Sequence, residues 1–323
     1  MILNPLGYQR SKGQNKRKLF TKIQNLMKTH NFFRRSAALV AVMSLGIVFS
    51  CQEDEAPYET ESAYVAEESV TDYYYEDADD MAGVVVASEG GTAGGKLSSE
   101  AGVFAVDDDR LCAQVLIAFD LASTLEHPIG TLTIDFGTGC EDPRGNRRSG
   151  KIFVRFDGRR FLPGSTIVIT FENYVINGIK LSGKRTLTNI TGSNESAPKF
   201  QIELEGGLAV WPDGTQATRE HCFTRTWNRG VLLNPSDDVL VVSQCADADV
   251  AASGVNRRGV SYSMVIESDL IYKRGCPIAV QGVKVFRANG KEVTVDYGDG
   301  TCDNIITITI EGNTRQVNVR KGG

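Results

Sequence analysis

The feature that most constrains the fold is a two-residue alternation of apolar and polar side chains, which recurs from residue 111 onward. Leu132, Ile134 and Phe136 alternate with polar neighbours. Three further segments repeat this pattern, at residues 152–156, 293–297 and 306–310. β-branched and aromatic residues dominate these segments, which favours strands with one buried face. No stretch of 12 residues in this region has a clear helical period.

Glycine, asparagine and aspartate separate the alternating segments. Asn177-Gly178 and Asn289-Gly290 are strong signals for two-residue hairpin turns. The pattern predicts an all-β protein with roughly twelve to sixteen short strands, arranged as an antiparallel β-sandwich or an extended meander. This β body covers residues 109–323, and its length suits one large domain or two sub-domains, near 109–215 and 216–323.

The N-terminal part has a different composition. Residues 1–50 contain nine basic side chains and no acidic one, and residues 37–48 form an apolar run of twelve residues. A bilayer requires roughly 20 apolar residues, so this run is too short to span one and fits the apolar region of a signal peptide. We therefore predict that residues 1–50 are an N-terminal extension followed by a signal peptide. The segment that begins at Met27 has the proportions of a signal peptide by itself, which leaves the translation of residues 1–26 open.

Three short motifs carry a family resemblance. Val48-Phe49-Ser50-Cys51 resembles the bacterial lipoprotein signal, although Phe49 is bulkier than the usual residue. Gln52-Glu53-Asp54-Glu55 resembles the surface-export signal of Bacteroidota lipoproteins, and the sequence DYGDGTCDN at 296–304 resembles the C-terminal region of uncharacterised members. The resemblance implies lipidation of Cys51, attachment to the outer membrane and an outward-facing body. It implies no known activity.

The segment that follows Cys51 is strongly acidic. Residues 51–110 contain 17 acidic side chains against Lys96 and Arg110, and residues 90–95 are rich in glycine. A segment of this kind buries too little apolar surface to offset its chain entropy. We predict that residues 51–108 form a disordered tether between the membrane and the β body.

Lipidation of Cys51 would leave six cysteines in the chain. They follow one another at similar separations, which favours three sequential disulfides among the fifteen possible connectivities. These candidates are Cys112, Cys140, Cys222, Cys245, Cys276 and Cys302. Zinc is the competing interpretation, but no two cysteines are spaced C-x₂-C and the chain has three histidines. Free buried thiols are the remaining alternative.

One acidic turn is a weak candidate for Ca²⁺, the only cofactor that the sequence suggests. Its oxygen ligands would be Asp296, Asp299, Asp303 and Asn304. The alternative is that the carboxylates accept hydrogen bonds from nearby backbone N–H groups in glycine-containing turns. This alternative is favoured.

Candidate residues for catalysis are few. Glu203 and Glu205 share one face of a predicted strand, as paired glycosidase carboxylates do, but such a pair also fits a solvated face. His221 precedes Cys222, yet neighbours on a strand point to opposite faces, which argues against a nucleophile–base pair. His127 lies in a predicted loop.

Weak binding candidates lie in or near predicted turns. They are Arg147, Arg148, Arg257 and Arg258, which would suit an anionic glycan, and Trp211, which could stack on a sugar ring. The alternatives are a charged hairpin tip for the arginines and packing against its own strand for Trp211.

The composition, with 41% apolar and 23% charged residues, excludes collagen-like, fully disordered and polytopic membrane proteins. The leading functional hypothesis is a lipid-anchored, non-catalytic binding or adhesion module. Its partners would be the membrane, through Cys51, and a glycan or another envelope protein, with no nucleic acid. The alternatives are a structural envelope component and a glycan-cleaving enzyme that uses Glu203 and Glu205.

Overall fold

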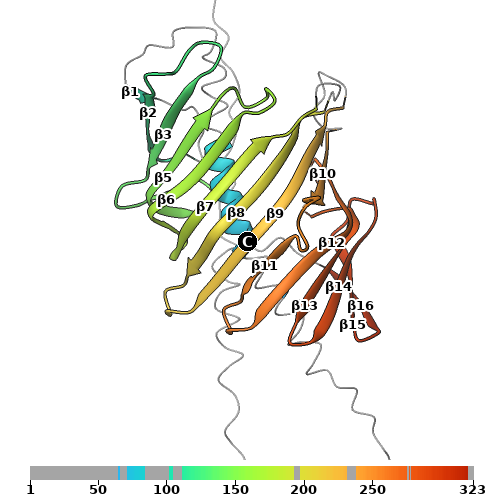
Figure 1. Ribbon diagram of the computed structural model, residues 1–323. Helices are drawn as coiled ribbons and strands as arrows, with labels where there is room; N and C mark the ends of the chain where they lie inside the picture. The colour runs from blue at the N-terminus through green and yellow to red at the C-terminus, as the bar shows by residue number, and fades with distance from the viewer. Residues whose placement is uncertain are drawn as a thin grey trace, which may run out of the picture. The chain divides into compact units, whose positions relative to one another are not determined.

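The structure is a computed structural model that describes residues 65, 71–83, 102–104, 111–192, 197–230, 238–274, 276 and 278–318. All of these residues belong to one compact unit, residues 53–323. They form a 16-stranded antiparallel sheet and a helix over residues 71–83 (Figure 1). The predicted all-β, antiparallel fold is confirmed, and of the two predicted arrangements the structure has the extended meander.

Nearly every strand pairs with its neighbours in the sequence. The exceptions are β4, which pairs with β5 alone, and β11, which continues the line of β10 between β9 and β12. The strands are β1 (Gly102–Phe104), β2 (Gln114–Phe119), β3 (Ile129–Asp135), β4 (Cys140–Glu141), β5 (Arg147–Asp157), β6 (Thr166–Ile176), β7 (Ile179–Asn189), β8 (Lys199–Val210), β9 (Gln216–Asn228), β10 (Val239–Gln244), β11 (Ala252–Val255), β12 (Ser261–Lys273), β13 (Gln281–Ala288), β14 (Lys291–Asp299), β15 (Ile305–Ile310) and β16 (Asn313–Asn318).

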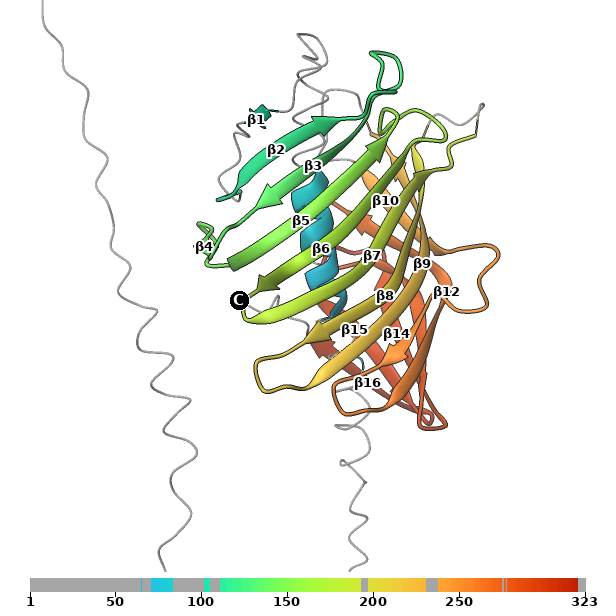
Figure 2. The same cartoon turned by 60° about the vertical axis from the view of Figure 1, so that its left-hand side comes forward.

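Alternation along the strands gives the sheet an apolar face, which we call the inner face. Leu132, Ile134, Ile152 and Val154 are completely buried there. The buried apolar residues form two clusters, one carried mainly by β2–β9 and one by β9–β15, although the sheet itself is continuous. The helix lies against the inner face, as Figures 1 and 2 show in cyan. The helix thereby supplies the second layer that a one-sided sheet requires.

Irregular pairings follow one another across β6, β7, β8 and β9 and help to bend the sheet around the helix (Figure 2). Gly183 on β7 has a positive φ of 128°. A Cβ atom at Gly183 would lie 3.0 Å from the Cα of Gly207 on β8. Glycine is therefore required where these two backbones approach each other. The helix contacts the sheet at this irregularity: the hydroxyl of Tyr75 donates a 2.7 Å hydrogen bond to the carbonyl oxygen of Ser182, the residue before Gly183.

Turn and cysteine chemistry agree with the sequence. Asn177 and Asn289 both adopt positive φ in two-residue hairpin turns, as predicted. The three sequential disulfides are confirmed, and they join Cys112 to Cys140, Cys222 to Cys245, and Cys276 to Cys302. Each disulfide has at least one cysteine in the connection between strands. The disulfides therefore hold strand ends together.

Candidate functional site

The acidic helix, residues 71–83, packs through one apolar stripe. Tyr75, Ala78, Met81 and Ala82 are at most 2% exposed, and their spacing places them on one side of a helix. The helix also carries five acidic side chains and no basic one. Isolated in water, such a short, acidic helix would be marginal. The sheet must therefore supply both the apolar contact and the opposite charge.

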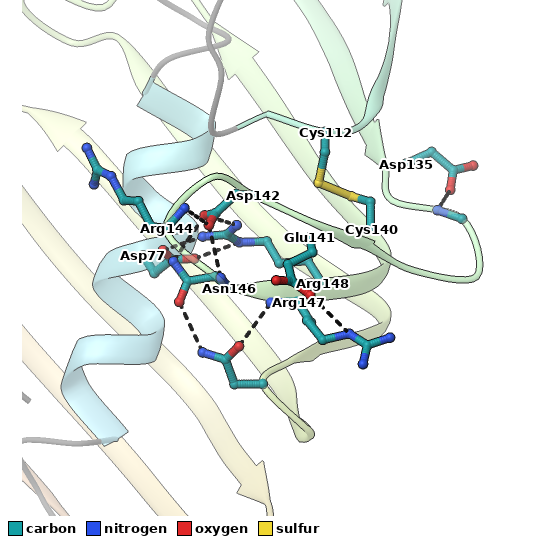
Figure 3. Close-up of a disulfide and its surroundings, with 12 residues drawn as sticks. Asp77, Cys112, Asp135, Cys140, Glu141, Asp142, Arg144, Asn146, Arg147 and Arg148 are labelled. Carbon is teal, nitrogen blue, oxygen red and sulfur yellow. Dashed lines mark hydrogen bonds and ion pairs between the residues drawn. A yellow bond between two sulfur atoms is a disulfide. The ribbon is translucent and has the colours of Figure 1, made fainter. Parts of the chain in front are cut away.

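Arg148 on β5 is the first of the arginines that provide this charge. Its guanidinium is buried and donates to Asp77 of the acidic helix at 2.7 and 3.1 Å, and to Asp142 at 2.8 Å (Figure 3). Burial alone would raise the pKa of Asp142, but hydrogen bonds from Arg148 and Asn146 lower it to about 2. Asp142 is ionised at neutral pH, so the guanidinium lies between two carboxylates.

Arg185 on β7 and Arg225 on β9 form a second set of pairs with the acidic helix. Arg185 lies 2.8 Å from Glu76 and 2.6 Å from Asp79, while Arg225 lies 2.9 Å from Glu76. Burial tends to raise the pKa of both carboxyl groups. At Glu76 the charges of two arginines outweigh burial, so the pKa of Glu76 is lowered. At Asp79 burial outweighs the charge of Arg185, and the negative charge of Glu76 acts in the same direction as burial, so the pKa of Asp79 is raised.

Arg219 on β9 completes the arginine set and pairs with Asp72 at 2.9 Å. Its Nε donates to Nδ1 of His221, which stacks on Phe223. Burial, followed by the charges of Arg185, Arg219 and Arg225, lowers the pKa of His221 well below its usual value. The imidazole is neutral at pH 7, and the bond from Arg219 assigns its proton to Nε2.

The prediction of a disordered tether from 51 to 108 is wrong for residues 71–83, which are helical, and for residues 102–104, which form β1. The composition of residues 51–108 indicates repulsion among acidic side chains. It does not show that arginines from outside this segment neutralise their charge. Those arginines come from strands far along the chain. The helical spacing of Tyr75, Ala78 and Ala82 was a local signal that could have identified the helix.

Two of the predicted glycan-binding arginines are committed to partners within the chain. Arg148 is buried, so its assignment as a surface ligand is wrong: it pairs with the acidic helix. Arg257 lies 4.4 Å from the Trp211 ring and donates to Asp213 at 2.8 Å and to Thr215 at 2.9 Å. Trp211 is itself 8% exposed. This arrangement fits packing of Trp211 against its own structure rather than stacking on a sugar.

The two remaining arginine candidates lie in turns. Arg147 is exposed, and its Nε lies 3.9 Å from Glu141. Arg258 donates its backbone N–H to the side chain of Asn256 in the β11–β12 turn. Arg258 follows Arg257 directly in the chain, so its turn lies beside Trp211, and the Arg147 backbone N–H donates to Asn177 in the neighbouring β6–β7 turn.

A different group of aromatic and basic side chains meets at one end of the sheet. Phe161, in the β5–β6 loop, has its ring 6.0 Å from that of Trp227 near the end of β9. The guanidinium carbons of Arg160 and Arg229 lie 5.5 and 5.4 Å from the Phe161 ring, and Arg229 also lies 4.8 Å from Trp227. We call these four residues the aromatic–arginine surface. The C-terminal ends of β5 and β9 lie at the same edge of the sheet, because the strands between them alternate in direction.

Phe161 remains 47% exposed despite these contacts, and the next residue, Leu162, is 51% exposed. Trp227 is held in place by a hydrogen bond from its Nε1 to Asp238. Aromatic rings and guanidinium groups can stack on flat apolar ligands and bind acidic ones. The sequence did not single out this surface, because Phe161 and Trp227 are separated by two hairpins.

The carboxylates considered for catalysis lie on the outer face, on the side of β8 opposite the buried Ile202 and Leu204. Glu205 pairs with Lys184, and Glu203 accepts a hydrogen bond from Gln201. His221 points to the inner face while Cys222 forms a disulfide, as strand alternation predicts. His127 is exposed and lies 2.6 Å from Asp157.

The acidic turn considered for Ca²⁺ uses its carboxylates locally. Asp296, Asp299 and Asp303 each accept a hydrogen bond from the backbone N–H two residues further along. Asn304 follows in the same connection. Among the described residues, no group of three or more histidine, cysteine, aspartate or glutamate side chains could hold a metal ion. The geometry is that of the turn alternative.

Residues 1–50, Cys51 and the acidic motif at 52–55 lie outside the described residues. Within the described part of the chain, no helix has the length and apolar character needed to span a membrane. No protein-family model matches this sequence, and searches of curated proteins and of solved structures find no significant match. The chemistry of this chain's own residues is therefore the basis on which its function is inferred.

Proposed function

We propose that this protein is a lipid-anchored, non-catalytic binding module of the cell envelope that contacts glycans through the aromatic–arginine surface. The observation that carries the proposal is the state of Phe161, which is flanked by two guanidinium groups and still 47% exposed. Flat, exposed aromatic faces can stack on the C–H faces of sugar rings. The sheet beneath them holds the rings in place, as a preorganised site requires.

The envelope location is supported by two features of the chain. Residues 37–51 have the pattern of a lipoprotein signal. The six cysteines of the body pair as three disulfides, which persist in oxidising compartments outside the cytosol. Mass spectrometry of the protein extracted from membranes tests the anchor. A diacyl or triacyl mass on Cys51, absent from a Cys51→Ser variant, is expected; an unmodified Cys51 in the membrane fraction would contradict it.

Binding is tested with the full chain in detergent, immobilised and exposed to neutral and acidic polysaccharides. Phe161→Ala removes the central ring and should weaken binding about tenfold or more, as loss of an aromatic contact residue does. Leu121→Ala is the matched control, because Leu121 is a fully exposed apolar residue on another loop. Failure of every polysaccharide to bind, or equal binding by Phe161→Ala and the wild type, would contradict the proposal.

A further inference from the structure

Arg229 is held above two aromatic rings at the aromatic–arginine surface. Its guanidinium carbon lies 4.8 Å from the Trp227 ring and 5.4 Å from the Phe161 ring. The residue is exposed, and the adjacent Gly230 N–H donates to Asp238, the same carboxylate that accepts from Trp227. Two ring contacts therefore position the guanidinium of an exposed residue.

The donors of Arg229 are uncommitted within the described residues, where its guanidinium makes ring contacts but no hydrogen bond or ion pair. The neighbouring arginines differ. Arg159 donates to the carbonyl oxygen of Leu125 at 2.6 Å. Arg160 also makes no side-chain hydrogen bond or ion pair among the described residues, but it is half-buried and its Nε is enclosed, whereas Arg229 is exposed. Arg229 is consequently the arginine of this surface that can offer several N–H groups to a ligand.

A second arginine of the chain also lies over a tryptophan ring, and it is paired with a carboxylate. The guanidinium of Arg257 lies 4.4 Å from the Trp211 ring, as that of Arg229 lies over Trp227. Unlike Arg229, Arg257 donates a 2.8 Å hydrogen bond from its Nη2 to the carboxylate of Asp213. The planar fork of arginine matches the two oxygens of a carboxylate. At Arg229, no described residue supplies that carboxylate. A ligand can supply it.

We propose that the glycan bound at this surface is a uronate polysaccharide, with a sugar carboxylate on Arg229 and a sugar ring against Phe161 and Trp227. This inference rests on the proposed function and specifies its ligand class. It depends on two features of the same surface. The N–H groups of Arg229 can bind a sugar carboxylate, and the flat faces of the aromatic rings can stack on a sugar ring. An anionic lipid surface would use the charge but would not require the flat faces.

A depression elsewhere in the described part of the molecule is less suited to an acidic ligand. It has a volume of about 560 Å³ beside the β13–β14 turn, and it is lined by Tyr262, Arg287, Lys291 and Glu292 among others. Arg287 pairs with Glu292, and Lys291 lies 3.8 Å from Glu311. Its cations are thus already balanced by acidic side chains of the same chain.

The test compares polygalacturonate with its fully methyl-esterified form, using the immobilised full chain in detergent at two salt concentrations. Esterification removes the charge and keeps the sugar ring. The wild type should bind the acidic form about tenfold or more tightly, as expected for one charged hydrogen-bonded pair. Arg229→Gln should reduce that affinity to the level of the ester, and Arg229→Lys should restore only part of it because the fork is lost. Arg287→Gln is the control for a change of net charge.

The outcomes separate this inference from the proposed function. Equal binding of both forms, lost in Phe161→Ala and unchanged in Arg229→Gln, would overturn the uronate assignment and keep the glycan-binding module. Arg229-dependent binding to phosphatidylglycerol vesicles without binding to polygalacturonate would also overturn it, in favour of a lipid surface. Absence of binding to either polysaccharide form, while another neutral glycan binds, would likewise exclude uronate. Absence of binding to any glycan would overturn both proposals.

Discussion

Asp77 and Arg148 are 71 positions apart in the sequence, and they form a two-point contact, with Nη2 and Nε of the arginine 2.7 and 3.1 Å from the carboxylate. This pair joins the acidic helix to the inner face of the sheet. Arg185, Arg219 and Arg225 form further ion pairs with acidic residues of the same helix. An acidic segment that composition assigns to a tether is thereby part of the folded body.

Removing a buried arginine should destabilise the body strongly. Arg185→Met leaves Glu76 and Asp79 without their shared partner, and breaking a buried pair from one side costs about 3–5 kcal/mol. Lys184→Met is the matched control on the same strand, because Lys184 is exposed on the opposite face and should change the urea midpoint little. Equal urea midpoints for the two variants would contradict the buried role of Arg185.

The stability of the body should depend on pH through Asp79. Its pKa is raised in the folded state, so between the unfolded and folded pKa values the folded protein binds more protons than the unfolded chain. Stability therefore falls as pH rises across that window. Urea unfolding of Asp79→Asn at pH 5 and pH 8 should show a smaller decrease than the wild type. If stability fell as much in Asp79→Asn as in the wild type between pH 5 and pH 8, the pH dependence would belong to other groups.

The tyrosines of the acidic helix should differ in their contribution. Tyr75→Phe removes the donor to the half-buried carbonyl oxygen of Ser182, at a cost of about 1 kcal/mol. Tyr73→Phe is the control, because Tyr73 is 51% exposed. Thermal unfolding of both variants measures the difference. Equal melting temperatures would show that the Tyr75 hydroxyl contributes nothing measurable.

The disulfides should contribute to stability through the unfolded chain. Cys276 and Cys302 close a separation of 26 residues, for which the chain-entropy model gives about 3–4 kcal/mol. The double variant Cys276→Ser/Cys302→Ser should unfold at lower urea concentration and remain folded in its absence. A midpoint equal to that of the wild type would show that this disulfide does not constrain the unfolded state.

The fold was predictable where the determining signal is local. Alternation placed Ile152 and Val154 on the buried face, and Asn177-Gly178 located a hairpin. Similar spacing was enough to favour the correct disulfides. The choice between sandwich and meander was not predictable, because it depends on how the whole sheet bends and on what covers it.

The site was mostly not predictable, since its residues are brought together by the topology. Arg148 and Arg257 resemble exposed turn residues in the sequence, yet each has an internal carboxylate partner. Phe161 and Trp227 attract little notice separately, and the meander places them 6.0 Å apart. Pairing between distant segments has no local signature, and the acidic helix was missed for the same reason.

Hydrogen–deuterium exchange of residues 71–83 in the full chain measures whether the acidic helix belongs to the folded body. We expect these amides to exchange slowly, with protection similar to that of β5–β9. We also expect Arg185→Met to accelerate their exchange before that of β13–β14. Exchange of residues 71–83 at the rate of an unstructured peptide in the wild type would contradict the first expectation, and would return this segment to the tether.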